Sequence, residues 1–241
     1  MHAGITMRAA AQPRDMTPRL VVFDVDGTLV DSQHVILDAM DVAFATLGEP
    51  MPAREAVLGI VGLSLNEAMA TLAPHLPEAD ALRLADAYRD RFVAQRAAGG
   101  AEAHAPLYPG ALDALERLAA RPGVLLGVAT GKARRGLDHV FASHGLARFF
   151  VTAQTADHHP SKPHPSMLLA ALAETGCDAA AAAMVGDTEF DMAMGRAAGL
   201  ATVGVAWGYH PRQRLLDAGA DVVIDDFAAL DAALERLGSA R

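Results

Sequence analysis

An apolar run that ends in two acids is the feature that most limits how this chain can fold. Leu20-Val-Val-Phe-Asp24-Val-Asp26-Gly27 begins with four apolar residues and ends in a glycine, which is the pattern of a short buried strand. Residues two apart in a strand point to the same side, so Asp24 and Asp26 are expected together where the strand ends. Buried carboxylates are costly without a neighbouring cation, and carboxylate and carbonyl oxygens suit Mg²⁺. The segment therefore predicts a metal site at the end of a buried strand.

Strands and helices alternate through the second half of the chain. Strands are predicted at 124–129, 149–151, 183–185, 201–205 and 222–224, and the segments between them have helical spacing. This alternation predicts an α/β protein with a doubly wound parallel sheet, because parallel strands are joined by right-handed helical crossovers. Ligands of such sheets bind beyond the carboxyl ends of the strands.

A stretch with helical spacing follows the first strand. Apolar residues recur every three or four positions from Ile36 to Leu47, and no strand pattern is found between about residues 33 and 105. We therefore expect an all-helical module inserted into the α/β core. The expected organisation is a core at 19–32 and 107–241, a helical module at 33–106, and a disordered leader at 1–18 without a signal-peptide segment.

Composition argues against several classes of protein. The formal net charge of −9 disfavours a nucleic-acid-binding protein, which usually presents a basic face. The single cysteine, Cys177, excludes an internal disulfide framework and fits a reducing compartment. No apolar run reaches the roughly 18 residues typical of a membrane-spanning helix. We expect a cytoplasmic protein, monomeric or homodimeric, that binds neither nucleic acid nor membrane.

The other chemically capable residues each come shortly after a predicted strand. They are Thr130 and Gly131, Lys162, and Asp187 and Asp191. Because the carboxyl ends of parallel strands share one edge of the sheet, these residues are expected to meet the first two acids there. Acids, a hydroxyl, a lysine and glycines are the groups that handle a phosphoryl group together with a metal.

Four motifs, in order and at plausible spacing, resemble those of the haloacid dehalogenase superfamily of hydrolases. They are D-x-D-G-T-L-x-D-S at 24–32, Thr-Gly at 130–131, Lys-Pro at 162–163 and G-D-T-x-x-D at 186–191. The resemblance covers essentially all of residues 20–241, including a helical cap inserted after the first motif. Runs that begin at Lys162, Gly195 and Gly204 are similar to the phosphoglycolate-phosphatase-like branch of that superfamily.

The resemblance implies a catalytic role for five residues. Asp24 would attack phosphorus and form an aspartyl-phosphate. Asp26 would protonate the leaving oxygen and later deprotonate the hydrolytic water. Thr130 and the Gly131 N–H would hold the phosphoryl oxygens, and Lys162 would neutralise the charge of the nucleophile and the phosphate.

The same resemblance implies a Mg²⁺ site. Asp24, the backbone carbonyl of Asp26 and Asp187 would bind the metal, and Asp191 would orient its shell. Thr188-x-x-Asp191 is also a capping signature for the helix that follows. Both roles of Asp191 can hold at once.

The inserted helices are expected to select the substrate, because a cap closes over such sites. Gly62, in the loop at 59–64, allows close approach of backbone to substrate. Arg54 could bind a substrate carboxylate or second phosphate, or it could be a surface helix residue. His34 could face the cleft, or it could face solvent.

Lysine is rare in this chain. The 20 basic residues include only two lysines, Lys132 and Lys162. A lysine under such a bias can matter, because its compact ammonium is not interchangeable with a guanidinium. Lys162 belongs to the motifs, whereas Lys132 is interpreted as a structural or solvent-exposed residue.

A Mg²⁺-dependent phosphatase of a small phosphorylated metabolite is the predicted function, with 2-phosphoglycolate as the leading substrate. Asp26 argues against a dehalogenase, which needs no second acid. Residues 33–105 contain no lysine, which argues against a phosphonate hydrolase that forms a Schiff base with a cap lysine. A pyrophosphatase and a sugar phosphomutase stay open, since the mutase shares the first steps and must exclude water. The intact acids and Lys162 disfavour a non-catalytic binding module.

Overall fold

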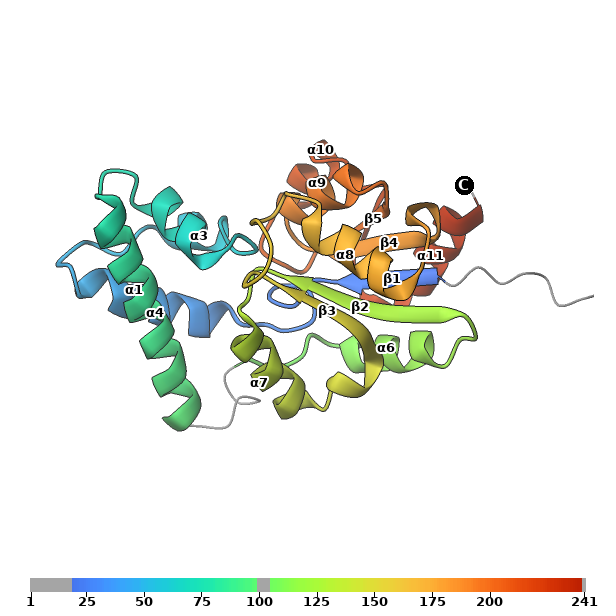
Figure 1. The fold of residues 1–241 in the computed structure, drawn as a ribbon, viewed down its shortest axis with the longest axis horizontal. Helices are drawn as coiled ribbons and strands as arrows, with labels where there is room; N and C mark the ends of the chain where they lie inside the picture. Colours follow the sequence, from blue (N-terminus) through green and yellow to red (C-terminus); the bar gives the residue numbers. More distant parts are fainter. Residues whose placement is uncertain (1–18, 99–104, 240–241) are drawn as a thin grey trace, which may run out of the picture.

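A six-stranded parallel sheet forms the centre of the α/β part of the protein (Figure 1). This computed structural model describes residues 19–98 and 105–239, so the expected leader at 1–18 lies outside the described residues. The strands lie in the order β3-β2-β1-β4-β5-β6, and every neighbouring pair is parallel, which confirms the predicted doubly wound fold. Their bounds are β1 Arg19–Phe23, β2 Val124–Thr130, β3 Phe150–Thr155, β4 Ala182–Gly186, β5 Ala201–Val205 and β6 Val222–Ile224.

Helices cover both faces of this sheet. One apolar core joins the sheet to α6 (Ala111–Ala119), α7 (Arg134–His144) and α11 (Leu230–Ser239). The opposite face is covered by α8 (Ser166–Thr175) and α9 (Glu189–Ala197), with α10 (Arg212–Asp217) packed beside α9. Three short 3₁₀ helices join these elements, namely η1 Ala147–Phe149, η2 Ala179–Ala181 and η3 Phe227–Ala229.

Strand β1 is buried on both faces of the sheet. Val21 and Phe23 pack into the core shared with α6, α7 and α11, whereas Leu20 and Val22 pack into the core beneath α8 and α9. Alternate residues of a strand point to opposite faces, so a strand covered on both sides reads as a continuous apolar run. This double burial explains the apolar run that precedes Asp24, and it fixes where that acid leaves the strand.

Among the described residues, four helices between β1 and α6 form a separate lobe beside the sheet (Figure 1). They pack around an apolar cluster of their own, which includes Met40, Phe44, Met69 and Leu84. We call this lobe the cap; its helices are α1 (Gln33–Ala45), α2 (Arg54–Leu58), α3 (Leu65–Leu72) and α4 (Glu78–Ala98). The exact domain boundaries remain a prediction.

The chain leaves the core and returns to it through two adjacent segments. Val30 forms an antiparallel bridge with Leu107. Asp31 donates its N–H to the Pro106 carbonyl at 2.8 Å, and Tyr108 donates to the Leu29 carbonyl at 2.9 Å. Both connections of the cap therefore lie side by side. Within the described ranges, no helix combines the length and apolarity needed to cross a membrane.

Candidate active site

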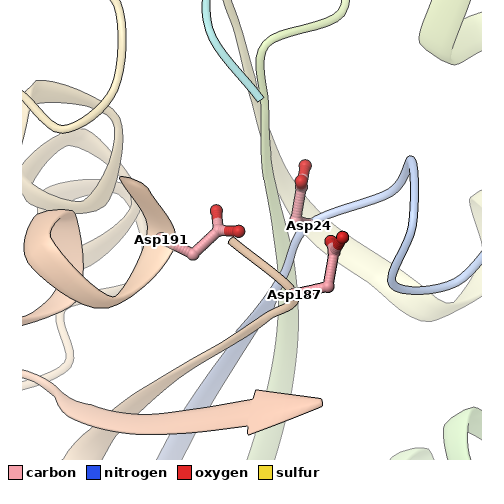
Figure 2. Close-up of side chains that lie close together, drawn as sticks. All are labelled: Asp24, Asp187 and Asp191. Carbon is pink, nitrogen blue, oxygen red and sulfur yellow. The ribbon is translucent and has the colours of Figure 1, made fainter. Parts of the chain in front are cut away.

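Predicted site residues from distant parts of the chain meet at the carboxyl end of the sheet. Asp24 follows β1, Asp187 follows the neighbouring strand β4, and Asp191 lies in the first turn of α9. Their carboxylates point toward one another (Figure 2), with one oxygen from each lying within 4.8 Å of the others. All three side chains are buried. The structure thus assembles the acidic cluster at the place the strand pattern indicates.

Lys162 provides a buried cation for this cluster. Its Nζ lies 3.0 Å from Asp24 Oδ1 and 2.7 Å from Asp191 Oδ1. Burial alone would lower the pKa of the lysine, but the Asp191 and Asp24 carboxylates outweigh burial and hold the pKa above its usual value. Lys162 is therefore a permanent positive charge beside the carboxylate of Asp24.

Asp24 keeps one side of its carboxylate unengaged. Although Oδ1 lies near Lys162, Oδ2 accepts no hydrogen bond from the described residues. Burial raises the pKa of Asp24 to about 7 against the opposing charge of Lys162, and the Asp191 and Asp26 carboxylates add to the rise. A buried anion with a free oxygen can serve as a nucleophile or as a metal ligand.

Asp187 is held by a hydroxyl and a backbone amide. Thr28 Oγ1 donates to its Oδ1 at 2.8 Å, and the Tyr209 N–H donates to its Oδ2 at 2.8 Å. Burial, and then the Asp191 and Asp24 carboxylates, raise the pKa of Asp187 well above its usual range. Gly27 has a φ of +82°, and a Cβ there would lie 2.2 Å from Asp187 Oδ2. The glycine of the first motif is thus required by backbone conformation and by close approach to this acid.

Asp191 has the capping role that its sequence pattern predicts. It completes a capping box with Thr188 at the start of α9. Its Oδ2 accepts from the Thr188 N–H at 3.1 Å and from the Thr188 hydroxyl at 2.7 Å, while Oδ1 lies against Lys162. Because both of its oxygens are engaged, Asp191 is placed to orient the Lys162 ammonium, which also lies beside Asp24.

The charges of the site fit a divalent cation. The site sets four carboxyl groups, those of Asp24, Asp26, Asp187 and Asp191, against two lysines, so the fully ionised carboxylates would leave a net charge of −2. Burial first, and then the neighbouring carboxylates, raise the pKa values of Asp24 and Asp187, so a bound cation would favour their ionised forms. The buried cluster of carboxylates can therefore hold a metal ion, with Asp24 and Asp187 offering oxygens to it.

The raised pKa of Asp24 predicts how the stability of the metal-free protein depends on pH. Burial raises the pKa of Asp24 from its usual 3.8 to about 7 in the folded protein, so between these values the folded state holds a proton that the unfolded state lacks. The stability contributed by this group is therefore lost as pH rises toward 7. In EDTA, we expect the free energy of unfolding of wild type, relative to Asp24→Asn, to fall between about pH 4 and pH 7. Denaturant titrations would measure it, and a difference that stays constant or grows with pH would contradict it.

Asp26 is held by two partners, neither of which the sequence identified. Ser32 Oγ donates to Asp26 Oδ1 at 2.6 Å, and Lys132 Nζ lies 2.9 Å from Asp26 Oδ2. The expectation that Lys132 is solvent-exposed is wrong, because its side chain is only 11% exposed and is ion-paired with Asp26; the alternative expectation of a structural role stays open. Its rarity was the one available signal: both lysines of the chain, Lys132 and Lys162, lie in this site.

A cavity of about 460 Å³ lies between this cluster and the cap. From the core it is lined by residues that include Asp24, Asp26, Thr130, Gly131 and Lys132. From the cap it is lined by apolar side chains that include Ile36, Met40, Tyr88 and Phe92. Gly62, the loop residue predicted to approach the substrate, lines it as well. A substrate in this cavity would have its reacting group at the sheet edge and its remainder against the cap.

Two cap residues predicted to bind substrate lie elsewhere. Arg54 is exposed and donates a hydrogen bond to Gln33 Oε1, and it does not line the cavity. His34 is exposed on α1 and does not line the cavity either. In this arrangement neither side chain lines the cavity, whereas Gly62 does.

The cap loop that contains Gly62 rests directly on the core. A Cβ on Gly131 would lie 2.5 Å from the Gly62 carbonyl oxygen, so only glycine allows the loop to come this close. Ser64 donates its N–H to Ser161 Oγ at 2.8 Å. His210 accepts from the Glu189 N–H at Nδ1, which leaves Nε2 to donate to the Gly59 carbonyl at 3.1 Å. These contacts place the cap loop over the carboxyl end of β2, where Thr130 and Gly131 lie.

Comparison with known proteins places this arrangement among hydrolases. The family described as haloacid dehalogenase-like hydrolase matches residues 21–205. The chain is 36% identical over 220 residues to the probable phosphatase IndB of Dickeya dadantii, covering 90% of this chain and 94% of that protein. It is 37% identical over 219 residues to the phosphoglycolate phosphatase of Rhodospirillum rubrum, covering 88% and 89%. A haloacid dehalogenase-like hydrolase structure from Streptococcus pneumoniae superposes with a TM-score of 0.77 at 26% identity, covering 90% and 98%.

Proposed function

The chain belongs to the haloacid dehalogenase-like hydrolases, and on that premise we propose that it hydrolyses a small phosphorylated metabolite through an aspartyl-phosphate on Asp24. Its similarity to proteins named as phosphatases supports its assignment as a phosphoric monoester hydrolase. The observation that carries the mechanism is the state of Asp24: it lines the cavity, is buried beside Lys162, and its second oxygen accepts no hydrogen bond from the described residues.

The first half of the reaction would transfer the phosphoryl group to the enzyme. The free oxygen of Asp24 forms a bond to phosphorus, and the bond from phosphorus to the leaving oxygen breaks. Asp26 lies in the same cavity and gives its proton to that oxygen. Thr130 and the Gly131 N–H, which line the cavity, would hold the phosphoryl oxygens, and Lys162 would offset their charge.

The second half would regenerate the enzyme. Asp26, now ionised, takes a proton from a water molecule whose oxygen forms a bond to phosphorus. The bond between phosphorus and the Asp24 oxygen breaks, and inorganic phosphate is released. Asp26 therefore ends the cycle with the proton that it needs for the next substrate.

Magnesium is the metal we propose for the acidic cluster. Asp24 and Asp187 would bind it through carboxylate oxygens and Asp26 through its backbone carbonyl, with Asp191 orienting the surroundings. Oxygen ligands from carboxylates and a carbonyl suit Mg²⁺. The ion would supply positive charge that stabilises the transferring phosphoryl group.

2-Phosphoglycolate is the leading candidate substrate. The Rhodospirillum rubrum relative is named a phosphoglycolate phosphatase, and a cavity of about 460 Å³ is of a size for a small metabolite. Pyrophosphate, a sugar phosphate and a nucleoside monophosphate are the rival substrates. A cytoplasmic location, and a monomer or homodimer, stay predictions from the sequence.

The full-length protein can be tested against 2-phosphoglycolate, pyrophosphate, a hexose 1-phosphate and p-nitrophenyl phosphate. We expect phosphate release, with the highest kcat/KM for 2-phosphoglycolate. Removal of metal with EDTA should lower the rate by at least about 100-fold, and Mg²⁺ should restore it. Conversion of the hexose 1-phosphate to its 6-phosphate without free phosphate would indicate a mutase, and no turnover of any compound would contradict the phosphatase function.

A further inference from the structure

Lys132 makes a contact with the proposed acid-base residue that the reaction, as set out above, does not use. Its Nζ lies 2.9 Å from Asp26 Oδ2, with side chains 11% and 13% exposed. Building on the proposed phosphatase function, we propose that Lys132 is a positioning residue, which holds the Asp26 carboxyl in the orientation that delivers its proton to the leaving oxygen.

The first argument is that Lys132 completes the fixation of the Asp26 carboxyl. Ser32 Oγ donates to Oδ1 at 2.6 Å and itself lies 3.0 Å from the Tyr209 hydroxyl. With Lys132 on the other oxygen, rotation of the carboxyl plane is opposed from both sides. A carboxylate has about four acceptor sites, so each oxygen keeps a site for the proton and for the leaving oxygen.

The second argument is that Lys132 is itself held in place from the core and from the cap. Its backbone N–H donates to Thr130 Oγ1 at 3.2 Å, which ties it to the residue proposed to hold the phosphoryl group. Its Nζ lies 4.9 Å from the centroid of the Phe92 ring on cap helix α4, within the range of a cation–π interaction. Lys132 therefore joins Asp26 to the cap wall of the cavity.

The third argument is that this ion pair is largely withdrawn from water. Ion pairs on a protein surface contribute little, because solvent screens them and two long side chains must be ordered. Here both side chains are mostly covered, and both residues line the cavity where the substrate would lie. The pair is thus positioned to fix geometry at the reacting atoms.

The test is the dependence of kcat/KM on the leaving group. A p-nitrophenolate leaves without a proton, whereas a simple alkoxide needs one from Asp26. Lys132→Met should therefore lower kcat/KM for the phosphate monoester of an uncharged alkyl alcohol at least about tenfold more than for p-nitrophenyl phosphate. This difference is a part of the rate enhancement that general acid catalysis contributes. The ratio of the two rates is measured on one sample, so it is independent of the fraction of folded enzyme.

Two reference variants sharpen the test. Arg135→Met removes another positive charge that lines the cavity and should leave the ratio between the two substrates unchanged. Asp26→Asn should change that ratio in the same direction as Lys132→Met and by more. Adding Lys132→Met to Asp26→Asn should then have little further effect on the ratio, since the two residues act through one group.

Three outcomes would overturn the proposal. Equal losses for both substrates would make Lys132 a phosphate-binding or structural residue. A loss confined to 2-phosphoglycolate would make it a ligand of the substrate carboxylate. Additive effects in the double variant would mean that it does not act through Asp26. If wild type releases no phosphate from any substrate, the proposed function itself has failed, and this result is separate from the other three.

Discussion

Replacing Asp24 with asparagine should lower kcat/KM by about 10⁴-fold or more, because the nucleophile is lost while the rest of the site stays in place. The amide is close in shape to the carboxylate but cannot form an acyl phosphate. Phosphate release from 2-phosphoglycolate and from p-nitrophenyl phosphate should fall together, since both reactions need the same attacking oxygen. Steady-state assays with Mg²⁺ would measure the loss.

The control for Asp24→Asn is its stability. The wild-type carboxylate lies buried near Asp26, Asp187 and Asp191, and burial and its acidic neighbours raise its pKa to about 7. Removal of one negative charge should therefore leave the metal-free protein at least as stable as wild type above neutral pH. Retention of more than about a hundredth of wild-type activity, with the intact mass showing no reversion to aspartate, would exclude Asp24 as the nucleophile.

Replacing Lys162 with methionine should damage both activity and stability. Lys162 is fully buried between Asp24 and Asp191, at 3.0 Å and 2.7 Å. Breaking a buried ion pair from one side typically costs about 3–5 kcal/mol, because the partner charges are left uncompensated. We expect a loss of this size in the metal-free protein, together with a fall in kcat/KM of about 10²–10³-fold from weaker charge stabilisation.

Denaturant unfolding in EDTA would measure the stability of Lys162→Met, with Lys132→Met as the matched variant. Lys132 is partly exposed and pairs with Asp26 rather than with the buried cluster, so its loss should cost the fold less than the loss of Lys162. Mg²⁺ should recover part of the lost stability of Lys162→Met, because a bound cation replaces some of the missing charge. Equal stability of the two variants would contradict the placement of Lys162 at the centre of the site.

The acids of the site were predictable because local patterns place them. Asp24 and Asp187 each follow an apolar run that forms a central strand, β1 or β4. Neighbouring parallel strands end at the same edge, so their adjacency follows from the fold class without any knowledge of side-chain contacts. The capping role of Asp191 is equally local, since it depends on Thr188 three residues earlier.

Strand β3 is longer than the strand that the apolar pattern of the sequence predicts. A strand is predicted at 149–151, whereas β3 runs from Phe150 to Thr155. Its second half is polar yet buried: the Thr152 hydroxyl donates to Glu174, and Gln154 donates to Thr152 Oγ1 at 2.8 Å. Hydrogen bonds to side chains replace apolar burial there, so the pattern that identifies β1 and β4 is missing.

The partners that hold the acids were not predictable from spacing. Lys132 reaches Asp26 from the end of a different strand, and Tyr209 reaches both Ser32 and Asp187 from the loop after β5. Such contacts depend on how loops far apart in the sequence fold over the sheet edge. The cap raises the same problem, because the direction of an isolated Arg54 depends on how α2 packs.

The most direct measurement is chemical trapping of residue 24 during turnover. Enzyme mixed with excess substrate and Mg²⁺ is quenched in acid, reduced with borohydride and digested for mass spectrometry. An acyl phosphate on Asp24 would be reduced to homoserine, so we expect homoserine at position 24 in wild type and none in Asp24→Asn or without substrate. Full turnover with an unmodified Asp24 in every quenched sample, or with the modification at another residue, would contradict the proposed mechanism.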